Sequence, residues 1–364
     1  MNQSVTGLVP YQGGKPIEEL SRERGIADIV KLASNENPRG PGPRARKALA
    51  EAAGELSRYP DGNGFRLKAA LADHLDVDPS RITLGNGSND VLDLAARVAV
   101  SPGTRGVVDA HCFVVYPMAI TAAGGELVTV PSANWGHDLE AMAAAVDETT
   151  RIMFLANPNN PTGTCFDEAA LFRFLEAVPR RVWVVLDEAY AEYVSGPVGA
   201  GGRYPDGVRL LDAHSNLIVT RTFSKIHALA ALRIGYAVSS AEFADLLNRV
   251  RQPFNANSLA LAAAEGALGD VEYATESRQL NDEGMDRLTR GFEALSLKWI
   301  PSAGNFVTFH VGPNRDAMAV YEALLDQGVI VRPVANYGMP EHLRVTVGLA
   351  DENDRFLKAL SRAL

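Results

Sequence analysis

The sequence contains only two cysteines, Cys112 and Cys165, which lie far apart in the chain. So few cysteines exclude a disulfide framework, and we expect a protein of the reducing cytoplasm. No apolar stretch approaches the roughly 18 residues of a membrane-spanning helix, so none is predicted. The first residues carry neither a basic segment nor an apolar core, and no secretory signal is expected.

Basic clusters are missing as well, because no run of five or more Lys and Arg residues occurs. The 364 residues carry 35 Lys and Arg against 44 Asp and Glu, a formal net charge of −9. This balance argues against nucleic acids and anionic membranes as partners. The seven histidines form no HExxH or other paired spacing, so no metal site is predicted.

Short apolar runs alternate with amphipathic helical patterns through the middle of the chain. They predict strands at residues 82–84, 106–109, 126–130, 151–156, 182–187, 216–222 and 232–239. Helices between such strands indicate a mainly parallel α/β sheet, whose ligands bind beyond the carboxyl ends of the strands. After about residue 260, a helical region that runs to about residue 297 precedes a smaller α+β lobe.

The length of the chain exceeds one simple core, so more than one domain is expected. We predict an N-terminal arm with part of the small domain at residues 1–45, a large domain at 46–260 and a small C-terminal domain at 261–364.

Polar clusters follow several of the predicted strands. GNGSND, at residues 85–90, could bind an anion through the amides of Ser88 and Asn89, although a capped helix start is the commoner explanation. NPNNPTGT, at residues 157–164, is a rigid polar loop that fits a turn and a site equally well. Asp187 ends an apolar run, where a carboxylate is costly without a cation, unless it caps the next helix.

The segment TFSK places Lys225 directly after another predicted strand. Most lysines lie at the surface, but a lysine in a dry pocket can lose its proton and act as an amine nucleophile. Arg332 and Arg344 occupy or follow apolar strands in the second lobe, and salt bridges within that lobe could explain them equally well.

Together these groups describe one ligand. A phosphate would bind the glycine-rich turn with Ser224 and Arg233, a carbonyl would condense with Lys225, and a protonated ring nitrogen would pair with Asp187. Pyridoxal 5′-phosphate has these three groups.

Longer motifs place the chain near a known family. The order NPNNPTGT, LDEAY, TFSKIHALAALRIGY and LRVTVG resembles the fold-type I pyridoxal-phosphate aminotransferases. The segments PYQGGKPIEEL, KLASNENPRGPGP and RYPDGNGFRLKAAL closely resemble the histidinol-phosphate aminotransferases, and the resemblance spans roughly residues 10–350. It implies a large cofactor-binding domain, pyridoxal 5′-phosphate as cofactor and a homodimer with shared active sites.

The resemblance also assigns roles to matching residues. Lys225 would carry the cofactor as a Schiff base, Asp187 would keep the ring nitrogen protonated, and Tyr190 and Asn160 would bond the phenolic oxygen. The residues that would stack on the ring or bind the phosphate are Phe113, Ser88, Asn89, Thr222, Ser224, Arg233 and, from the partner subunit, Tyr59. The residues that would meet the substrate are Tyr11, Asn37, Arg332 and Arg344.

The chain departs from the family pattern after the lysine. The family usually has an aromatic residue and a glycine there, and a second glycine before Leu-Arg, whereas this chain has His227, Ala228 and Ala231. An alanine would be strained if that glycine needs a positive φ. We do not expect His227 to act as a general base, because Lys225 already fills that role.

The expected reaction moves the amino group of histidinol phosphate to 2-oxoglutarate, giving imidazole acetol phosphate and glutamate. An aromatic aminotransferase is the nearest alternative, because Arg344 could bind any α-carboxylate. A phosphothreonine decarboxylase would be a lyase on the same scaffold. A non-catalytic regulator is the most distant alternative, since no DNA-binding module is visible in the sequence.

Overall fold

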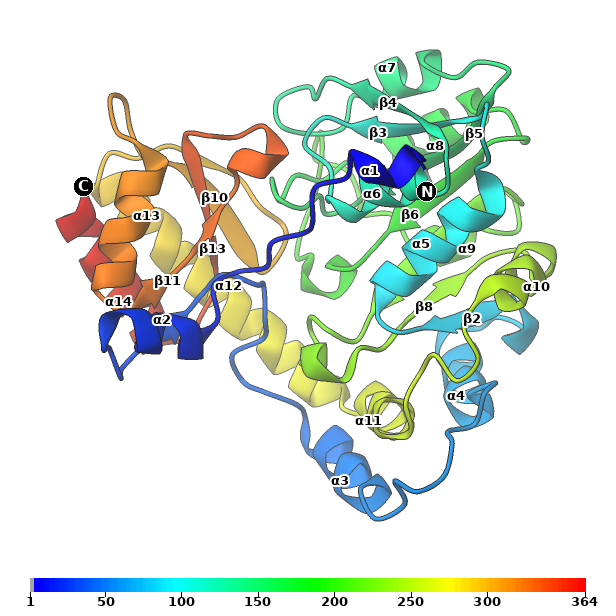
Figure 1. The fold of residues 1–364 in the computed structure, drawn as a ribbon, viewed down its shortest axis with the longest axis horizontal. Helices are drawn as coiled ribbons and strands as arrows, with labels where there is room; N and C mark the ends of the chain where they lie inside the picture. The colour runs from blue at the N-terminus through cyan, green and yellow to red at the C-terminus, as the bar shows by residue number, and fades with distance from the viewer. Residues whose placement is uncertain (1–2) are drawn as a thin grey trace.

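The apolar runs of the middle of the chain form one seven-stranded sheet in a computed structural model, which describes residues 3–364 (Figure 1). The strands are β2 (Ile82–Gly85), β3 (Arg105–Asp109), β4 (Glu126–Val130), β5 (Thr150–Ala156), β6 (Trp183–Asp187), β7 (Leu217–Thr222) and β8 (Gly235–Val238). Their spatial order is β2-β8-β7-β6-β5-β3-β4, and only β8 runs antiparallel to its neighbours. The predicted mainly parallel α/β sheet is confirmed.

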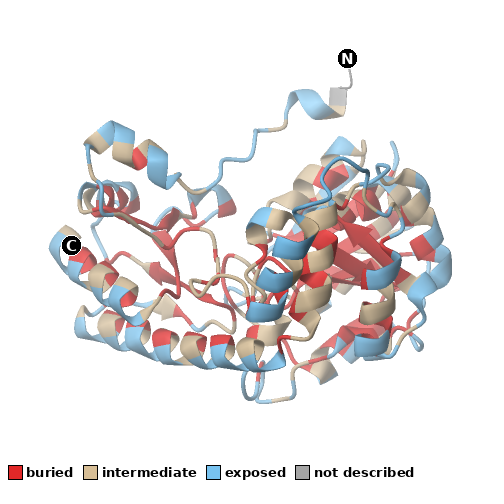
Figure 2. Ribbon diagram, turned by 90° about the horizontal axis from the view of Figure 1, so that it is seen from below, coloured by how far each residue is buried: buried red, intermediate tan, exposed pale blue. Residues whose placement is uncertain are grey.

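Helices pack on this sheet and on one another, and we call the sheet with these helices the large lobe. They are α3 (Pro43–Ala52), α4 (Phe65–Leu75), α5 (Ser88–Ala99), α6 (Val115–Ala122), α7 (Leu139–Ala144), α8 (Glu168–Ala177), α9 (Gly207–Leu210), α10 (Ala241–Val250) and α11 (Ser258–Leu268). The central strands are buried beneath them, as Figure 2 shows. Such strands read as continuous apolar runs because both of their faces are covered.

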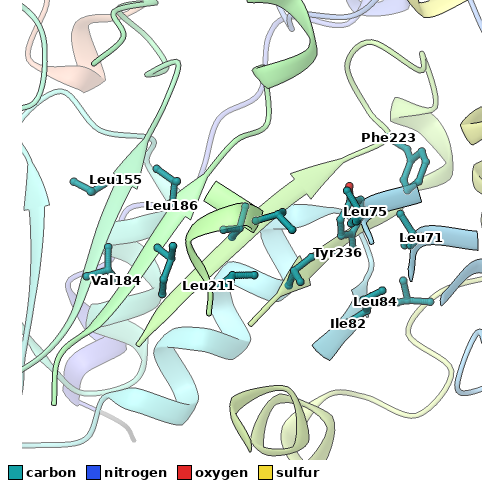
Figure 3. Close-up of a cluster of buried hydrophobic side chains, with 14 of the residues drawn as sticks. Leu71, Leu75, Ile82, Leu84, Leu155, Val184, Leu186, Leu211, Phe223 and Tyr236 are labelled. Carbon is teal, nitrogen blue, oxygen red and sulfur yellow. The ribbon is translucent and has the colours of Figure 1, made fainter. Parts of the chain in front are cut away.

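The large lobe has a well-packed core, part of which Figure 3 shows in close-up. Leu71 of α4 and Ile82 of β2 belong to the same buried cluster as Leu155 and Leu186 of the central strands. Each of these four side chains is fully buried. Burying such a side chain stabilises the fold by about 1.5–3 kcal/mol. The cluster therefore fixes the strands whose ends carry the polar residues.

A smaller four-stranded sheet forms the core of the second lobe, which we call the small lobe. Its strands are β9 (Trp299–Ile300), β10 (Phe306–His310), β12 (Arg332–Pro333) and β13 (His342–Thr346), in the order β12-β13-β10-β9. The accompanying helices are α12 (Val271–Ala294), α13 (Ala317–Asp326) and α14 (Ala350–Ala363). Figure 1 shows α12 leading from α11 of the large lobe to this sheet.

The N-terminal segment crosses between the two lobes (Figure 1). Its first helix, α1 (Gln3–Thr6), lies against α6, and α2 (Ile17–Arg24) lies beside the small lobe. Strand β1 (Val30–Lys31) then pairs in parallel with β11 (Val329–Ile330). Residues near the N-terminus thus pair with a strand of the C-terminal part of the chain. The domain boundaries at residues 45 and 260 stay a prediction.

The bounds of two elements differ from those that the periodicity predicts. The helical region after residue 260 breaks into α11 and α12 around Asp270, whose carboxylate accepts hydrogen bonds from the Arg44 and Ala45 amides, each at 3.1 Å, and so holds the junction to α3. Strand β8 begins only at Gly235 because Arg233 is left-handed, with φ 58°. Within residues 3–364, no helix is long and apolar enough to cross a membrane.

Candidate active site

One cavity collects most of the predicted site residues at the carboxyl ends of the large-lobe strands. The predicted residues that line it are Tyr11, Ser88, Asn89, Phe113, Asn160, Asp187, Tyr190, Thr222, Ser224, Lys225, Arg233 and Arg344. They come from the arm, from loops after β2, β3, β5, β6 and β7, and from β13 of the small lobe. Three predicted residues, Asn37, Tyr59 and Arg332, do not line this cavity.

Asp187 is held at the end of β6 by two hydroxyl groups. Tyr116 donates to its Oδ2 atom at 2.7 Å, and Thr220 donates to its Oδ1 atom at 3.0 Å. Burial raises the pKa of this carboxyl above its usual value, while the two hydroxyl donors lower it. A buried carboxylate of this kind is best satisfied by a cation placed against it.

Lys225 lies in the loop that follows β7, and its amine faces the cavity. The Nζ atom donates to the carbonyl oxygens of Ser34 and Asn35, each at 3.2 Å. Burial, and then the nearby Arg344 guanidinium, lower the pKa of Lys225 to about 7. A substantial fraction of the amine is therefore neutral near pH 7, as a nucleophile or a base requires.

The start of α5 faces the side chains that follow β7. Thr222 Oγ1 accepts from the Ser224 amide at 3.1 Å, and Arg233 donates to Ser224 Oγ at 3.3 Å. Gly87, at φ 80°, precedes α5, and a Cβ atom there would collide with the Arg233 guanidinium. The helix start, the hydroxyls and the guanidinium form a cradle for an anion such as a phosphate.

Residues 157–164 form the polar loop after β5, and its Asn160 side chain reaches the small lobe. The Asn160 Oδ1 atom accepts a hydrogen bond from Arg344, which also donates to the Ala33 carbonyl at 3.0 Å. Tyr190 lies close by, and its hydroxyl accepts from Asn35 at 2.9 Å. Burial raises the pKa of Tyr190, so its phenol stays protonated.

Two arginines stand opposite each other on the small-lobe sheet. Arg332 pairs with Arg344 in the register of β12 and β13, and both are buried. The Arg332 guanidinium donates to the Gln12 carbonyl at 2.5 Å and lies 5.6 Å from the centre of the Tyr11 ring. Arg332 therefore lies behind the part of the arm that lines the cavity.

Asn37 and Tyr59 occupy different surroundings from the cavity. Asn37 donates to the Ile226 carbonyl at 2.9 Å and to Ser277 at 3.2 Å, so it braces the loop of Lys225. Tyr59 is 84% exposed and stacks on Phe254 with ring centres 4.7 Å apart. Their predicted contacts with substrate and with a partner's cofactor stay predictions.

The loop after Lys225 has a residue with positive φ at the position where the family usually has a glycine. Ala228 is left-handed, with φ 57°, and its amide donates to the Lys225 carbonyl at 2.9 Å. The positive φ at which an alanine is expected to be strained is thus present at Ala228. His227 packs beside Phe223 and does not line the cavity, and burial lowers its pKa to about 4.

Sequence reasoning missed the residues that support the site. Tyr116 and Thr220 orient Asp187, and Asn35 binds Tyr190. Tyr337 and Gly14 are among the other residues that line the cavity. A signal for Thr220 existed, because it precedes Thr222 by two residues on β7 and therefore faces the same side of the sheet.

The groups present fit the chemistry of pyridoxal 5′-phosphate. The cradle at α5 suits a phosphate, Asp187 suits a protonated ring nitrogen, and Lys225 suits an aldehyde. Among residues 3–364, no group of three or more His, Cys, Asp or Glu side chains could hold a metal ion.

Comparisons with known proteins agree with this site. The family model for aminotransferase class I and II matches residues 27–360. Histidinol-phosphate aminotransferase 2 of Pseudomonas aeruginosa is 58% identical over 362 residues, which cover 99% of this chain and 96% of that protein. Histidinol-phosphate aminotransferase 1 of Nitrosococcus oceani is 53% identical over 360 residues, covering 99% and 95%.

A solved structure shows the same architecture. It is the histidinol-phosphate aminotransferase from Sinorhizobium meliloti in complex with pyridoxal-5′-phosphate, with a TM-score of 0.88 and 30% identity, covering 100% of this chain and 97% of that one. Fold and site together define a pyridoxal-phosphate-dependent transferase of fold type I. The chain belongs to the class I and II aminotransferases and, within them, to the histidinol-phosphate aminotransferase family.

Proposed function

We propose that this aminotransferase moves the amino group of histidinol phosphate to 2-oxoglutarate, giving imidazole acetol phosphate and L-glutamate in histidine biosynthesis. The observation that carries the proposal is the pair of buried arginines on β12 and β13, of which Arg344 lines the cavity and Arg332 lies opposite it, behind the arm. The names of relatives that match nearly the whole chain at up to 58% identity support the same substrate.

A pair of arginines is better matched to a phosphate than to a single carboxylate. One bidentate guanidinium satisfies a carboxylate, whereas a phosphate dianion has more charge and more acceptor oxygens. Tyr11 adds a phenol beside Arg332. Glutamate would use the same arginines through its two carboxylates, which explains how one pocket serves both half-reactions.

On this proposal, each predicted cofactor residue has a physical task. Ser88, Asn89, Thr222, Ser224 and Arg233 would hold the phosphate, and Phe113 would cover the ring. Asp187 would hold the ring nitrogen in its protonated form, while Tyr190 and Asn160 would bond the phenolic oxygen.

Bound pyridoxal 5′-phosphate supplies an electron sink for the bond broken at the substrate's Cα. Lys225 would take up the proton from that carbon, because its pKa of about 7 leaves the amine partly neutral. Tyr116 and Thr220 would keep the Asp187 carboxylate fixed through both half-reactions.

A homodimer in the cytoplasm completes the proposal. Tyr59 is a large aromatic side chain left 84% exposed, together with Phe65 at 73% exposed and Leu56 at 65% exposed. Exposed apolar side chains gathered in one segment are typical of a surface that a second subunit covers. Both cysteines are free, which suits a reducing compartment.

Steady-state assays with several amino donors test the substrate. We expect kcat/KM to be highest for histidinol phosphate, and we expect Arg332→Ala to raise its KM about ten- to a hundredfold, since charge-assisted bonds contribute about 1.5–3 kcal/mol each. Phenylalanine has no phosphate and should suffer less from the same substitution.

Each alternative function predicts a different outcome. A wild type that prefers phenylalanine or tyrosine would be an aromatic aminotransferase. Release of carbon dioxide from phosphothreonine without any need for 2-oxoglutarate would indicate the decarboxylase.

A further inference from the structure

A second cavity, of about 470 Å³, lies between the two lobes and shares no lining residue with the active site. We call it the interlobe cavity. One wall comes from the large lobe, at residues 134–135, 163–165 and 193–199. The other wall comes from α12 and from residues 299–304 of the small lobe.

Direct hydrogen bonds hold the two walls together. The Ala303 amide donates to the Gly163 carbonyl at 2.9 Å, and Ser195 Oγ donates to Asp282 Oδ1 at 3.1 Å. Gly163 has φ 80°, and a Cβ atom there would collide with Ser302, so the backbones approach closely. The interlobe cavity is therefore bounded by defined contacts on both sides.

The charged side chain that lines the interlobe cavity is negative. Asp282 is its only ionisable carboxylate, and no Lys, Arg or His occurs among the described residues that line it. Asp282 forms no salt bridge within residues 3–364, although Arg278 lies one turn earlier on α12. Burial raises the pKa of Asp282 above its usual value, while the Ser195 hydroxyl and the Arg278 guanidinium lower it.

Polar and aromatic side chains also line the interlobe cavity. Asn281 is 5% exposed and donates to the Gly304 carbonyl at 3.3 Å, which ties α12 to this wall. Two tryptophans, Trp135 and Trp299, also line the space. Aromatic faces beside a carboxylate are the usual environment for an organic cation.

We propose that the interlobe cavity binds a small organic ammonium ion, with Asp282 as its counter-ion and the two tryptophans against its apolar part. Acceptors and aromatic rings without any lining cation exclude anions by charge. The active site differs, because three cationic side chains, Lys225, Arg233 and Arg344, line it beside the single carboxylate of Asp187. In the holoenzyme Asp187 would face the cofactor ring, so an added cation should choose the interlobe cavity.

The test uses benzyltrimethylammonium chloride with the holoenzyme. Its quaternary nitrogen has no N–H and cannot condense with a carbonyl, so it does not react with the cofactor. We expect saturable binding of one cation per chain by calorimetry, with a change in tryptophan fluorescence. Benzyl alcohol and benzoate, which are neutral and anionic, should bind at least tenfold more weakly.

Variants locate the site. Asp282→Asn should weaken binding about tenfold and leave transamination unchanged, whereas the matched control Asp286→Asn, one turn later on α12 and outside the lining, should bind as the wild type does. Trp135→Phe and Trp299→Phe should each reduce the fluorescence change. Trp183→Phe should not, because Trp183 packs on Phe243.

Three results would overturn the proposal: equal binding of benzoate, wild-type binding by Asp282→Asn, or an undiminished fluorescence change in both Trp135→Phe and Trp299→Phe. If Asp282→Asn does not fold, the two tryptophan variants and the benzoate comparison still decide the question.

Discussion

The two sides of the active-site cavity are built in different ways. On the cofactor side, Asp187, Thr222 and Ser224 are 5%, 4% and 7% exposed and are held by hydrogen bonds at the ends of buried strands. On the arm, Tyr11 lines the cavity and is 53% exposed, while Tyr59, which lies outside the cavity in this chain, is 84% exposed. The core of the chain orients the first group, whereas it leaves the two rings of the second group exposed.

The difference separates the groups that the core holds in place from those that it leaves exposed. Groups on buried strand ends are preorganised, so they suit the part of the reaction that every substrate shares. Groups on the arm and on exposed turns can vary without disturbing the core. Substitutions on the two sides should therefore differ in both kind and size.

The largest effect should follow from Lys225→Ala on the cofactor side. It removes the amine whose pKa is about 7 and with it the proton transfer, which we expect to cost about 10³-fold or more in kcat. Stopped assays with histidinol phosphate measure the loss, and borohydride should no longer trap the cofactor on the chain. Full turnover by this variant would break the assignment of Lys225.

A smaller loss should follow from Asp187→Asn. The change keeps the shape of the side chain but removes the negative charge, and we expect kcat to fall about 10²-fold or more. Tyr116→Phe and Thr220→Val serve as matched controls, because each removes only one hydrogen bond to Asp187 and should cost much less. A near-wild-type kcat for Asp187→Asn would contradict the role of the charge.

The smallest effect concerns the loop after Lys225. Ala228 has φ 57°, and a left-handed alanine is strained by about 1–2 kcal/mol. Because glycine loses more conformational freedom on folding, Ala228→Gly should raise the free energy of unfolding by a net amount of about 1 kcal/mol or less. Urea denaturation measures the change.

The control for this prediction lies three residues further along. Ala231 has no positive φ, so Ala231→Gly should lower the free energy of unfolding by about 0.5–1 kcal/mol. A loss of stability in both variants would show that the left-handed loop carries no strain.

The sequence predicts the cofactor side better than the rim, for a physical reason. Lys225, Asp187 and Ser88 each stand next to an apolar strand, so their place at the strand ends follows from local pattern alone. Thr220 and Tyr116 meet Asp187 only through strand pairing and helix packing, for example the register that sets Asp187 opposite Thr220. Such contacts cannot be read from spacing along the chain.

The small lobe shows the same limit. The apolar run VIVRPV, at residues 329–334, divides between β11, which pairs with β1, and β12, which pairs with β13. The opposition of Arg332 and Arg344 arises from that second pairing. Neither arginine's neighbours could be predicted before the register was known.

The central claim, that one chain supplies the cofactor side and a second chain completes the rim, is tested by a mixed dimer. Tyr59→Phe subunits retain Lys225, and Lys225→Ala subunits retain Tyr59, so each type supplies what the other lacks. We predict that the mixed dimer recovers about one normal site, measured as kcat/KM for histidinol phosphate and as tightly held cofactor. Activity no higher than that expected from the two homodimers, or a fully active monomer at high dilution, would contradict the account.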